Sequence, residues 1–255
     1  MIEVLSPAEL ERAEVSGKFI GDPLRTLRER TQVGTHLMEI DAWTHELIDA
    51  AGAESCYVDY APSFGSGPFG HYICTSVNDA VLHGMPRKYK LKDGDLLSLD
   101  LACSLHGIVA DAAISFVVGT PKSDEDLRMI EATEAARAAG IAEARVGNKI
   151  GDISHAIGEV LRGYGYPVNT DFGGHGVGST MHQDPHIPND GRAGRGYKLR
   201  EGLLLAIEPW VMAGTDQLVT DKKDGWTLRS KTGSRTAHSE HTVAITAAGP
   251  KILTA

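Results

Sequence analysis

Two long apolar segments joined by a very short turn constrain this chain more than any other part of its sequence. Residues 95–104 and 108–118 are rich in Leu, Val, Ile and Ala, and only a few residues separate them. This pattern predicts two antiparallel strands of one β-hairpin. Each predicted strand also contains one carboxylate among apolar neighbours, Asp100 in the first and Asp111 in the second.

The two aspartates are expected to face each other across the hairpin. A turn centred on Leu105–His106 would pair Asp100 directly with Asp111. Like charges opposed across two strands repel, and burying a charge without compensation is costly. No Lys or Arg lies in either strand. A bound cation is therefore the simplest partner, and two aspartates at a solvated sheet edge are the alternative.

Other candidate ligands lie where predicted strands begin or end and where glycines cluster. His175 is surrounded by glycines, which let the backbone and a ligand approach closely. Glu208 ends a strongly apolar segment and precedes a proline, a position where solvated glutamates are unusual. Glu240 comes just before another apolar stretch. With the two aspartates, these residues make an oxygen-rich set that suits two adjacent divalent ions better than a thiolate zinc site.

The order of predicted elements indicates an α+β fold. Ser6, Pro7 and Glu9 form a start signal for the first helix. Helices are expected over residues 6–30, 40–51, 123–147 and 153–161, and further strands over 72–77, 203–211, 226–230 and 238–246. Two helices followed by strands, and then the same again, suggest one unit used twice. No linker is apparent, so residues 1–255 are expected to form a single domain.

Charge and cysteine content narrow the function. The chain has 25 Lys and Arg against 34 Asp and Glu, a net charge of -9, which argues against a nucleic-acid partner. Its three cysteines (Cys56, Cys74 and Cys103) are too few and odd in number for a disulfide framework, which favours the reducing cytoplasm. No segment has the length of a membrane span or the pattern of a secretory signal.

A series of short motifs resembles the type I methionine aminopeptidases of peptidase family M24. The motifs run in family order along nearly the whole chain: residues 75–84, Leu99-Asp100, Asp111, residues 174–178, His182, Pro185, Ile207-Glu208-Pro209, residues 224–226 and residues 239–242. The resemblance implies the pita-bread fold, a pseudo-two-fold single domain with central antiparallel β-structure flanked by helices. It also implies removal of the initiator methionine from nascent polypeptides when the second residue is small, by a hydroxide that bridges two metal ions.

The same resemblance implies a role for each candidate ligand. Asp100 would chelate one divalent ion, and Asp111 and Glu240 would bridge both ions. His175 and Glu208 would bind the second ion, with Glu208 also passing a proton. The ions would be Fe, Mn, Co or Zn, and the partner would be the N-terminal peptide of a nascent protein. The sequence carries no signal for the oligomeric state, and a monomer is the default expectation.

Further residues are implied in substrate binding. His83 and His182 would contact the substrate and the tetrahedral intermediate as catalytic histidines that bind no metal. Trp226, Phe69 and Cys74 would lie around the methionine side chain. Ser98 and Thr236 fall near a position where the family implies a monovalent cation. The loop over residues 64–72 departs from the aromatic-rich family stretch. Met181 stands where the family often has an aromatic residue, and Ser179 where it often has a basic one. The shape of the methionine pocket therefore stays open.

Three alternative functions are weighed against this one. Prolidases, aminopeptidases P and related enzymes of broader specificity have a large N-terminal domain, for which Asp100 comes too early. Type II methionine aminopeptidases have a helical insert, for which the segment between His182 and Glu208 is too short. A catalytically inactive pita-bread protein would act as a binding module, but such proteins typically lose ligands, and all five are present here.

Overall fold

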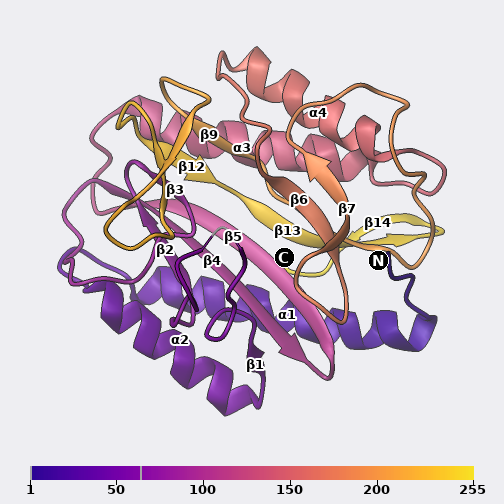
Figure 1. The fold of residues 1–255 in the computed structure, drawn as a ribbon, viewed down its shortest axis with the longest axis horizontal. Coiled ribbons are helices and arrows are strands. Elements are labelled where there is room, and N and C mark those ends of the chain that lie inside the picture. The colour runs from indigo at the N-terminus through magenta and orange to yellow at the C-terminus, as the bar shows by residue number, and fades with distance from the viewer. Residues whose placement is uncertain (1, 64) are drawn as a thin grey trace.

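The computed structural model describes residues 2–63 and 65–255, and within them four helices flank a central antiparallel sheet (Figure 1). The helices are α1 (Pro7–Arg30), α2 (Leu37–Ala51), α3 (Asp124–Glu143) and α4 (Ile150–Gly163). The strands are β1 (Glu54–Ser55), β2 (Cys74–Val77), β3 (Ala80–Leu82), β4 (Asp95–Leu105), β5 (Ile108–Val118), β6 (Gly173–Val177), β7 (Gln183–Pro188), β8 (Leu204–Ile207), β9 (Trp210–Met212), β10 (Leu218–Thr220), β11 (Leu228–Ser230), β12 (Thr236–His238), β13 (Glu240–Thr246) and β14 (Gly249–Ile252). The predicted α+β class is confirmed.

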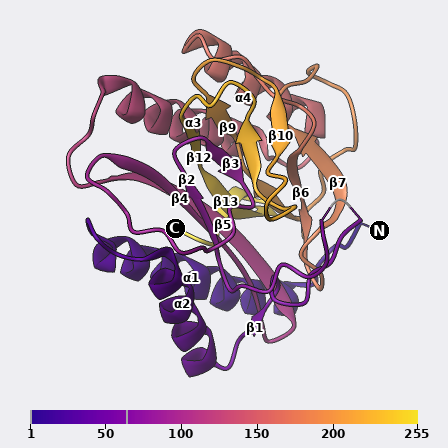
Figure 2. The same cartoon turned by 60° about the vertical axis from the view of Figure 1, so that its left-hand side comes forward.

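The central sheet joins the two halves of the chain. Its strands follow the order β1-β4-β5-β13-β8-β6-β7, with β2 also paired to β4 and β14 to β13. Helices α1 and α2 lie on one side of this sheet and α3 and α4 on the other (Figures 1 and 2). Each half of the sequence thus supplies two helices and part of the sheet, as the suggestion of one unit used twice predicts. Among the described residues, no helix combines the length and apolar character needed to cross a membrane.

Helix α1 begins as predicted and covers the long hairpin. The Ser6 hydroxyl accepts a hydrogen bond from the Glu9 N–H (3.4 Å), and the Glu9 carboxylate accepts one from the Ser6 N–H (2.7 Å). Ile20, Leu24 and Leu27 recur at helical spacing and are almost completely buried. Each such side chain contributes about 1.5–3 kcal/mol by burial, which fixes α1 on β4 and β5.

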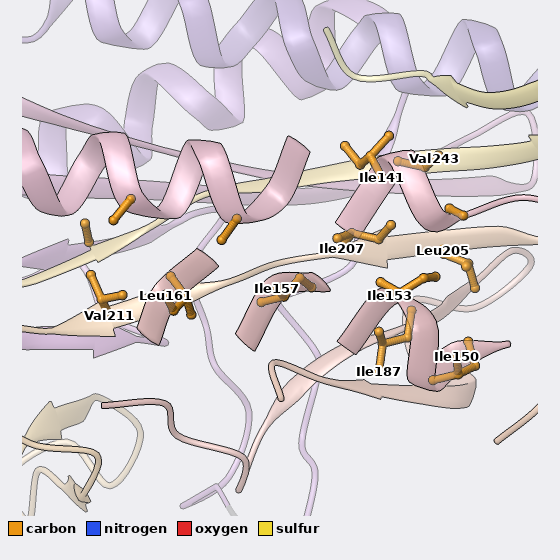
Figure 3. Close-up of a cluster of buried hydrophobic side chains, with 14 of the residues drawn as sticks. Ile141, Ile150, Ile153, Ile157, Leu161, Ile187, Leu205, Ile207, Val211 and Val243 are labelled. Atoms are coloured by element: carbon orange, nitrogen blue, oxygen red, sulfur yellow. The ribbon is translucent and has the colours of Figure 1, made fainter. Parts of the chain in front are cut away.

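The second half has its own apolar core between α4 and the sheet (Figure 3). Ile153, Ile157 and Leu161 lie along one face of α4, each four residues from the next, and all three are fully buried. They belong to the same cluster as Leu205 and Ile207 of β8. This packing holds the strand that ends beside Glu208.

The register of the β4–β5 hairpin differs from the prediction. The turn is His106-Gly107, whose φ angles of 55° and 77° are both in the left-handed region, as a two-residue type I′ turn requires. Asp100 therefore pairs with Ala113, and Asp111 pairs with Ala102. Direct opposition of the two aspartates was the wrong prediction, but a shift of two residues keeps both side chains on the same face of the sheet.

Other element boundaries also differ from the prediction. Pro209 divides the strand expected over residues 203–211 into β8 and β9, because proline has no N–H to donate to a ladder. Ser239 divides the strand expected over 238–246 into β12 and β13, and its N–H donates to the Pro209 carbonyl (3.1 Å). Helix α3 ends at Glu143 rather than at Gly147. The breaks at Pro209 and Ser239 lie directly beside the candidate ligands Glu208 and Glu240.

Candidate metal centre

Five adjacent strands of the central sheet each bring one candidate ligand to the same cavity. The strands are β4, β5, β13, β8 and β6, in their order across the sheet. In that order the ligands are Asp100, Asp111, Glu240, Glu208 and His175, with Glu208 one residue beyond the end of β8. All five line a cavity of about 40 Å³, which has room for an ion or a water molecule. The structure thus brings together every ligand that the sequence suggested.

Glycines allow β6 to place His175 between two neighbouring strands. A Cβ on Gly174 would lie 2.2 Å from the Ala206 carbonyl oxygen, and one on Gly176 would lie 2.2 Å from the Asp184 carbonyl oxygen. Any larger residue would therefore push β6 away from β8 or β7. The close backbone approach predicted from the glycine run is present.

The backbone of Asp111 is fixed by a side chain from β13. The Thr242 hydroxyl accepts a hydrogen bond from the Asp111 N–H and donates one to the Asp111 carbonyl, both at 2.8 Å. This contact ties the end of the β5–β13 pairing to the residue whose carboxylate lies in the cavity. It leaves little freedom for Asp111 to move away from Glu240, which begins β13.

The donor atoms are spaced for metal binding. The Nε2 atom of His175 lies 3.4 Å from Glu208 Oε1 and 4.0 Å from Asp111 Oδ2. Donor atoms of Asp111, His175 and Glu240 all lie within 4.8 Å of one another. The Nδ1 atom of His175 lies 3.0 Å from the Gly176 carbonyl, which can only accept a hydrogen bond. The proton therefore sits on Nδ1, and Nε2 is the nitrogen available to a metal.

The buried carboxylates repel one another. Burial raises the pKa of the Asp111 carboxyl well above its usual range, and the charges of Asp100 and Glu208 raise it further. Burial and the charge of Asp111 likewise raise the pKa of Glu240, and the Arg137 guanidinium offsets this only in part. Among the described residues, Glu240 Oε1 has no hydrogen-bond partner. Orphaned buried oxygen atoms among mutually repelling acids fit a site for divalent cations.

Glu208 differs from the other acids because imidazoles surround it. Burial alone would raise its pKa, but contact with His238 and the nearby His175 and His182 lower the pKa below its usual value. The Nε2 atom of His238 lies 3.6 Å from Glu208 Oε2, whereas His175 lies beside the other oxygen, Oε1. Glu208 is therefore a carboxylate at neutral pH and can accept a proton.

These pKa shifts predict that metal affinity depends on pH. Asp111 and Glu240 retain a proton to higher pH than usual when no metal is bound, and a metal must displace that proton. The affinity for Mn²⁺ is therefore expected to increase from about pH 5 to about pH 8, with release of protons. Isothermal titration in buffers of different ionisation enthalpy measures both quantities. An affinity independent of pH would contradict the proposed repulsion between these carboxylates.

The two expected catalytic histidines lie at the opening of the cavity. Burial, followed by the charge of His175, lowers the pKa of His182 to about 3, and burial lowers the pKa of His83. Both imidazoles are therefore neutral at physiological pH. They also line a wider groove of about 360 Å³ that continues from the cavity past Phe172. His83 and Phe172 meet edge to face, with ring centroids 6.1 Å apart.

The expected pocket residues form an apolar wall beside the acids. Phe69, Cys74, Met181 and Trp226 all line the cavity. The rings of Phe69 and Trp226 meet edge to face, with centroids 5.2 Å apart. Phe64, at the start of the divergent loop, lies outside the described residues. The cavity thus has an acidic side and an apolar side.

The two hydroxyls expected near a monovalent cation have protein partners. The Ser98 hydroxyl lies 2.6 Å from the Ser115 hydroxyl, and the Thr236 hydroxyl donates to the carbonyls of Asn78 and Ala80 (3.0 and 2.7 Å). Carbonyl oxygens, such as those of Asn78 and Ala80 beside Thr236, are ligands that small cations bind. The bound cation stays a prediction.

Three residues at the centre escaped the sequence analysis. Tyr57 and Tyr60 lie in a loop before β2 and line the cavity. His238 is buried against Glu208. It precedes Glu240 by two positions, and strand periodicity would have placed both on one face. No comparable signal exists for the two tyrosines, because a loop has no periodicity.

The chain is similar over its whole length to known metallopeptidases. The sequence model of metallopeptidase family M24 matches residues 16–247. The methionine aminopeptidase of Clostridium acetobutylicum is 40% identical, with 100% of this chain and 99% of the relative aligned. The crystal structure of methionine aminopeptidase from Rickettsia prowazekii has a TM-score of 0.94 at 31% identity and covers 100% of both chains. That from Thermotoga maritima has a TM-score of 0.93 at 35% identity, covering 100% of this chain and 99% of its own. These matches confirm the predicted pita-bread fold.

Proposed function

Because the chain belongs to the methionine aminopeptidases of metallopeptidase family M24, we propose that its clustered acids and histidine hold two divalent ions for N-terminal methionine removal. The protein is thus a metal-dependent hydrolase that takes methionine from peptides whose second residue is small. The observation that carries this proposal is the convergence of four carboxylates and one imidazole on one buried cavity. The presence of all five ligands argues against an inactive binding module.

The ligands divide between the two ions as follows. Asp100 would hold the first ion, His175 and Glu208 would hold the second, and Asp111 and Glu240 would contribute to both. When bound, such ions lower the pKa of water and polarise the peptide carbonyl. The oxygen-rich set is compatible with Fe, Mn, Co or Zn.

The remaining polar residues move protons and stabilise charge. Glu208 would take the proton of the attacking water and deliver it to the leaving amine, a role open to it because it is ionised at neutral pH. Neutral His182 donates a hydrogen bond to the carbonyl oxygen as negative charge develops there. His83, across the opening, contacts the peptide beyond the scissile bond.

The cavity and groove also set the direction of the substrate. The methionine side chain lies against the apolar wall of Phe69, Cys74 and Trp226, which suits an unbranched thioether. The following residues leave through the groove past Phe172. The substrate α-amine would coordinate a metal ion, so it must be free and the peptide must begin there.

Four peptides test this substrate model. Met-Ala-Ser is expected to be cleaved efficiently, and Met-Lys-Ser about 100-fold more slowly, because the family implies a cramped site beyond the scissile bond. Leu-Ala-Ser probes the apolar wall, and N-acetyl-Met-Ala-Ser should resist cleavage because its amine is blocked. Released amino acid is measured by mass spectrometry. Efficient cleavage of the acetylated peptide would overturn the requirement for a free amine, and equal rates on Met and Leu would refute methionine selectivity.

Metal-dependent release of methionine from Met-Ala separates the enzyme from the alternative of a binding module. The assay compares protein stripped by a chelator with the same protein after Mn²⁺ or Co²⁺ is restored. We expect activity to be lost and then recovered.

We also propose that residues 1–255 act as one monomeric catalytic domain in the cytoplasm. The free thiols of Cys56, Cys74 and Cys103 support the reducing location.

A further inference from the structure

One short turn brings two phenol groups to different parts of the centre. The backbone N–H of Tyr60 donates to the carbonyl of Tyr57 (3.0 Å), so the positions of the two residues are coupled. Tyr57 is buried and Tyr60 is half-buried, and both line the cavity. The reaction as described above assigns no task to either side chain.

Tyr57 contacts the two aspartates of the β4–β5 hairpin. Its hydroxyl donates to Asp100 Oδ1 at 2.5 Å and lies 3.5 Å from Asp111 Oδ1. Its ring meets Phe69 edge to face, with centroids 5.7 Å apart, which restricts the ring. A carboxylate oxygen can only accept, so the Tyr57 hydroxyl is the donor in this contact.

Such a donor determines how Asp100 presents its two oxygens. A carboxylate can rotate about its terminal bond, and a hydrogen bond to one oxygen reduces that freedom. A carboxylate oxygen has two lone pairs, so Oδ1 can accept from Tyr57 while the carboxylate, held in one orientation, would still chelate an ion. Groups that hold a ligand in this way typically change metal affinity about 10–100-fold.

Tyr60 contacts His182 instead. Its hydroxyl lies 2.9 Å from His182 Nδ1, and its ring packs at an angle against the His182 and Trp226 rings. A neutral imidazole has one N–H, on either Nδ1 or Nε2. When the phenol donates to Nδ1, that N–H must be on Nε2, where it can reach a substrate oxygen.

We propose that the turn over residues 57–60 is a positioning element of the active site, in which Tyr57 orients Asp100 for metal binding and Tyr60 fixes His182 in the tautomer that donates through Nε2. This inference rests on the proposed function, since it assumes that Asp100 binds metal and that His182 contacts substrate. The two tyrosines act on different partners, so their effects separate.

Tyr57→Phe and Tyr60→Phe are matched variants, because each removes one hydroxyl and keeps the ring. The full chain is stripped of metal and titrated with Co²⁺, followed by calorimetry and by the visible Co²⁺ spectrum. Tyr57→Phe is expected to weaken binding of at least one ion about 10–100-fold and to shift the spectrum. Tyr60→Phe is expected to bind Co²⁺ as the wild type does. Equal affinity in wild type and Tyr57→Phe overturns the role of Tyr57.

Two measurements on the unaltered chain keep the test independent of variant folding. In a crystal structure of the Co²⁺-loaded protein, the Tyr57 hydroxyl should donate to an Asp100 oxygen, and a separation beyond hydrogen-bond distance overturns its role. A wild-type chain that binds no Co²⁺ refutes the proposed function itself, which distinguishes the two failures.

The role of Tyr60 has its own signature. In ¹⁵N-histidine-labelled, Zn²⁺-loaded protein, the His182 signals should show a protonated Nε2 and an unprotonated Nδ1, and Tyr60→Phe should show a mixture. The same variant is expected to lose about tenfold in kcat with little change in KM. A protonated Nδ1 in the wild type, or an unchanged kcat in Tyr60→Phe, overturns the assignment.

Discussion

Asp111→Asn and Glu240→Gln are each expected to abolish tight metal binding together with peptide cleavage. Both carboxylates are almost fully buried and stand between the other ligands. An amide has no negative charge to share between two cations, so either change weakens both ions at once. Loss of metal catalysis removes several kcal/mol of transition-state stabilisation, so kcat/KM should fall by at least about 10³-fold.

Metal analysis by mass spectrometry and a Met-Ala assay check this result together. Asp95→Asn is the matched control, because Asp95 is a buried carboxylate of strand β4, which pairs with the strand that holds Asp111. The Asp95 carboxylate accepts hydrogen bonds from Asn78, Tyr89 and the Lys92 N–H, and it does not line the cavity. The control should lose stability but keep its ions. Two tightly held ions in either bridging variant would refute the assignment of these carboxylates as bridges.

His182→Ala is expected to keep both metal ions and lose turnover. Its imidazole is neutral, lies at the opening of the cavity, and stands edge to face with His175 at a centroid distance of 4.4 Å. Removing a hydrogen-bond donor to a developing oxyanion typically costs about 10²–10³-fold in kcat. Steady-state kinetics on Met-Ala-Ser and metal analysis of the same sample measure the two effects.

His155→Ala, on α4 and away from the cavity, is the control for this variant. It should retain both kcat and metal. A kcat near wild type in His182→Ala would mean that His182 only supports its neighbours. Loss of metal in His182→Ala would instead show that His182 is a metal ligand.

The ligands could be found from the sequence because each lies in a short motif with an unusual local pattern. Asp100 and Asp111 interrupt apolar strands, and Glu208 ends one before a proline. Their mutual arrangement was less accessible, since the type I′ turn at His106-Gly107 shifts the register by two residues. A shift of two residues leaves each side chain on the same face of the sheet but changes the residue that it pairs with. A prediction based on alternation therefore placed the two aspartates correctly on one face of the sheet but gave them the wrong cross-strand partners.

The supporting residues could not be predicted in the same way. Tyr57 and Tyr60 reach the centre through the path of an irregular loop, and their partners Asp100 and His182 lie far along the chain. The break at Ser239, which separates His238 from β13, depends on a hydrogen bond to Pro209. Contacts of this kind follow from tertiary packing rather than from local pattern.

The joining of distant strands at the centre has a consequence for how the protein is made. Asp111 and Thr242 are 131 residues apart and are hydrogen-bonded through both backbone groups of the aspartate. During synthesis the hairpin with its two like charges therefore emerges long before Glu208 and Glu240 can join it. Until then the edge of β5 that pairs with β13 has no partner strand and is prone to aggregate. Since such long-range pairing forms slowly, we expect metal uptake to mark the completion of folding and not to initiate it. A newly made chain would become competent for metal only after the strands that carry Glu208 and Glu240 are in place.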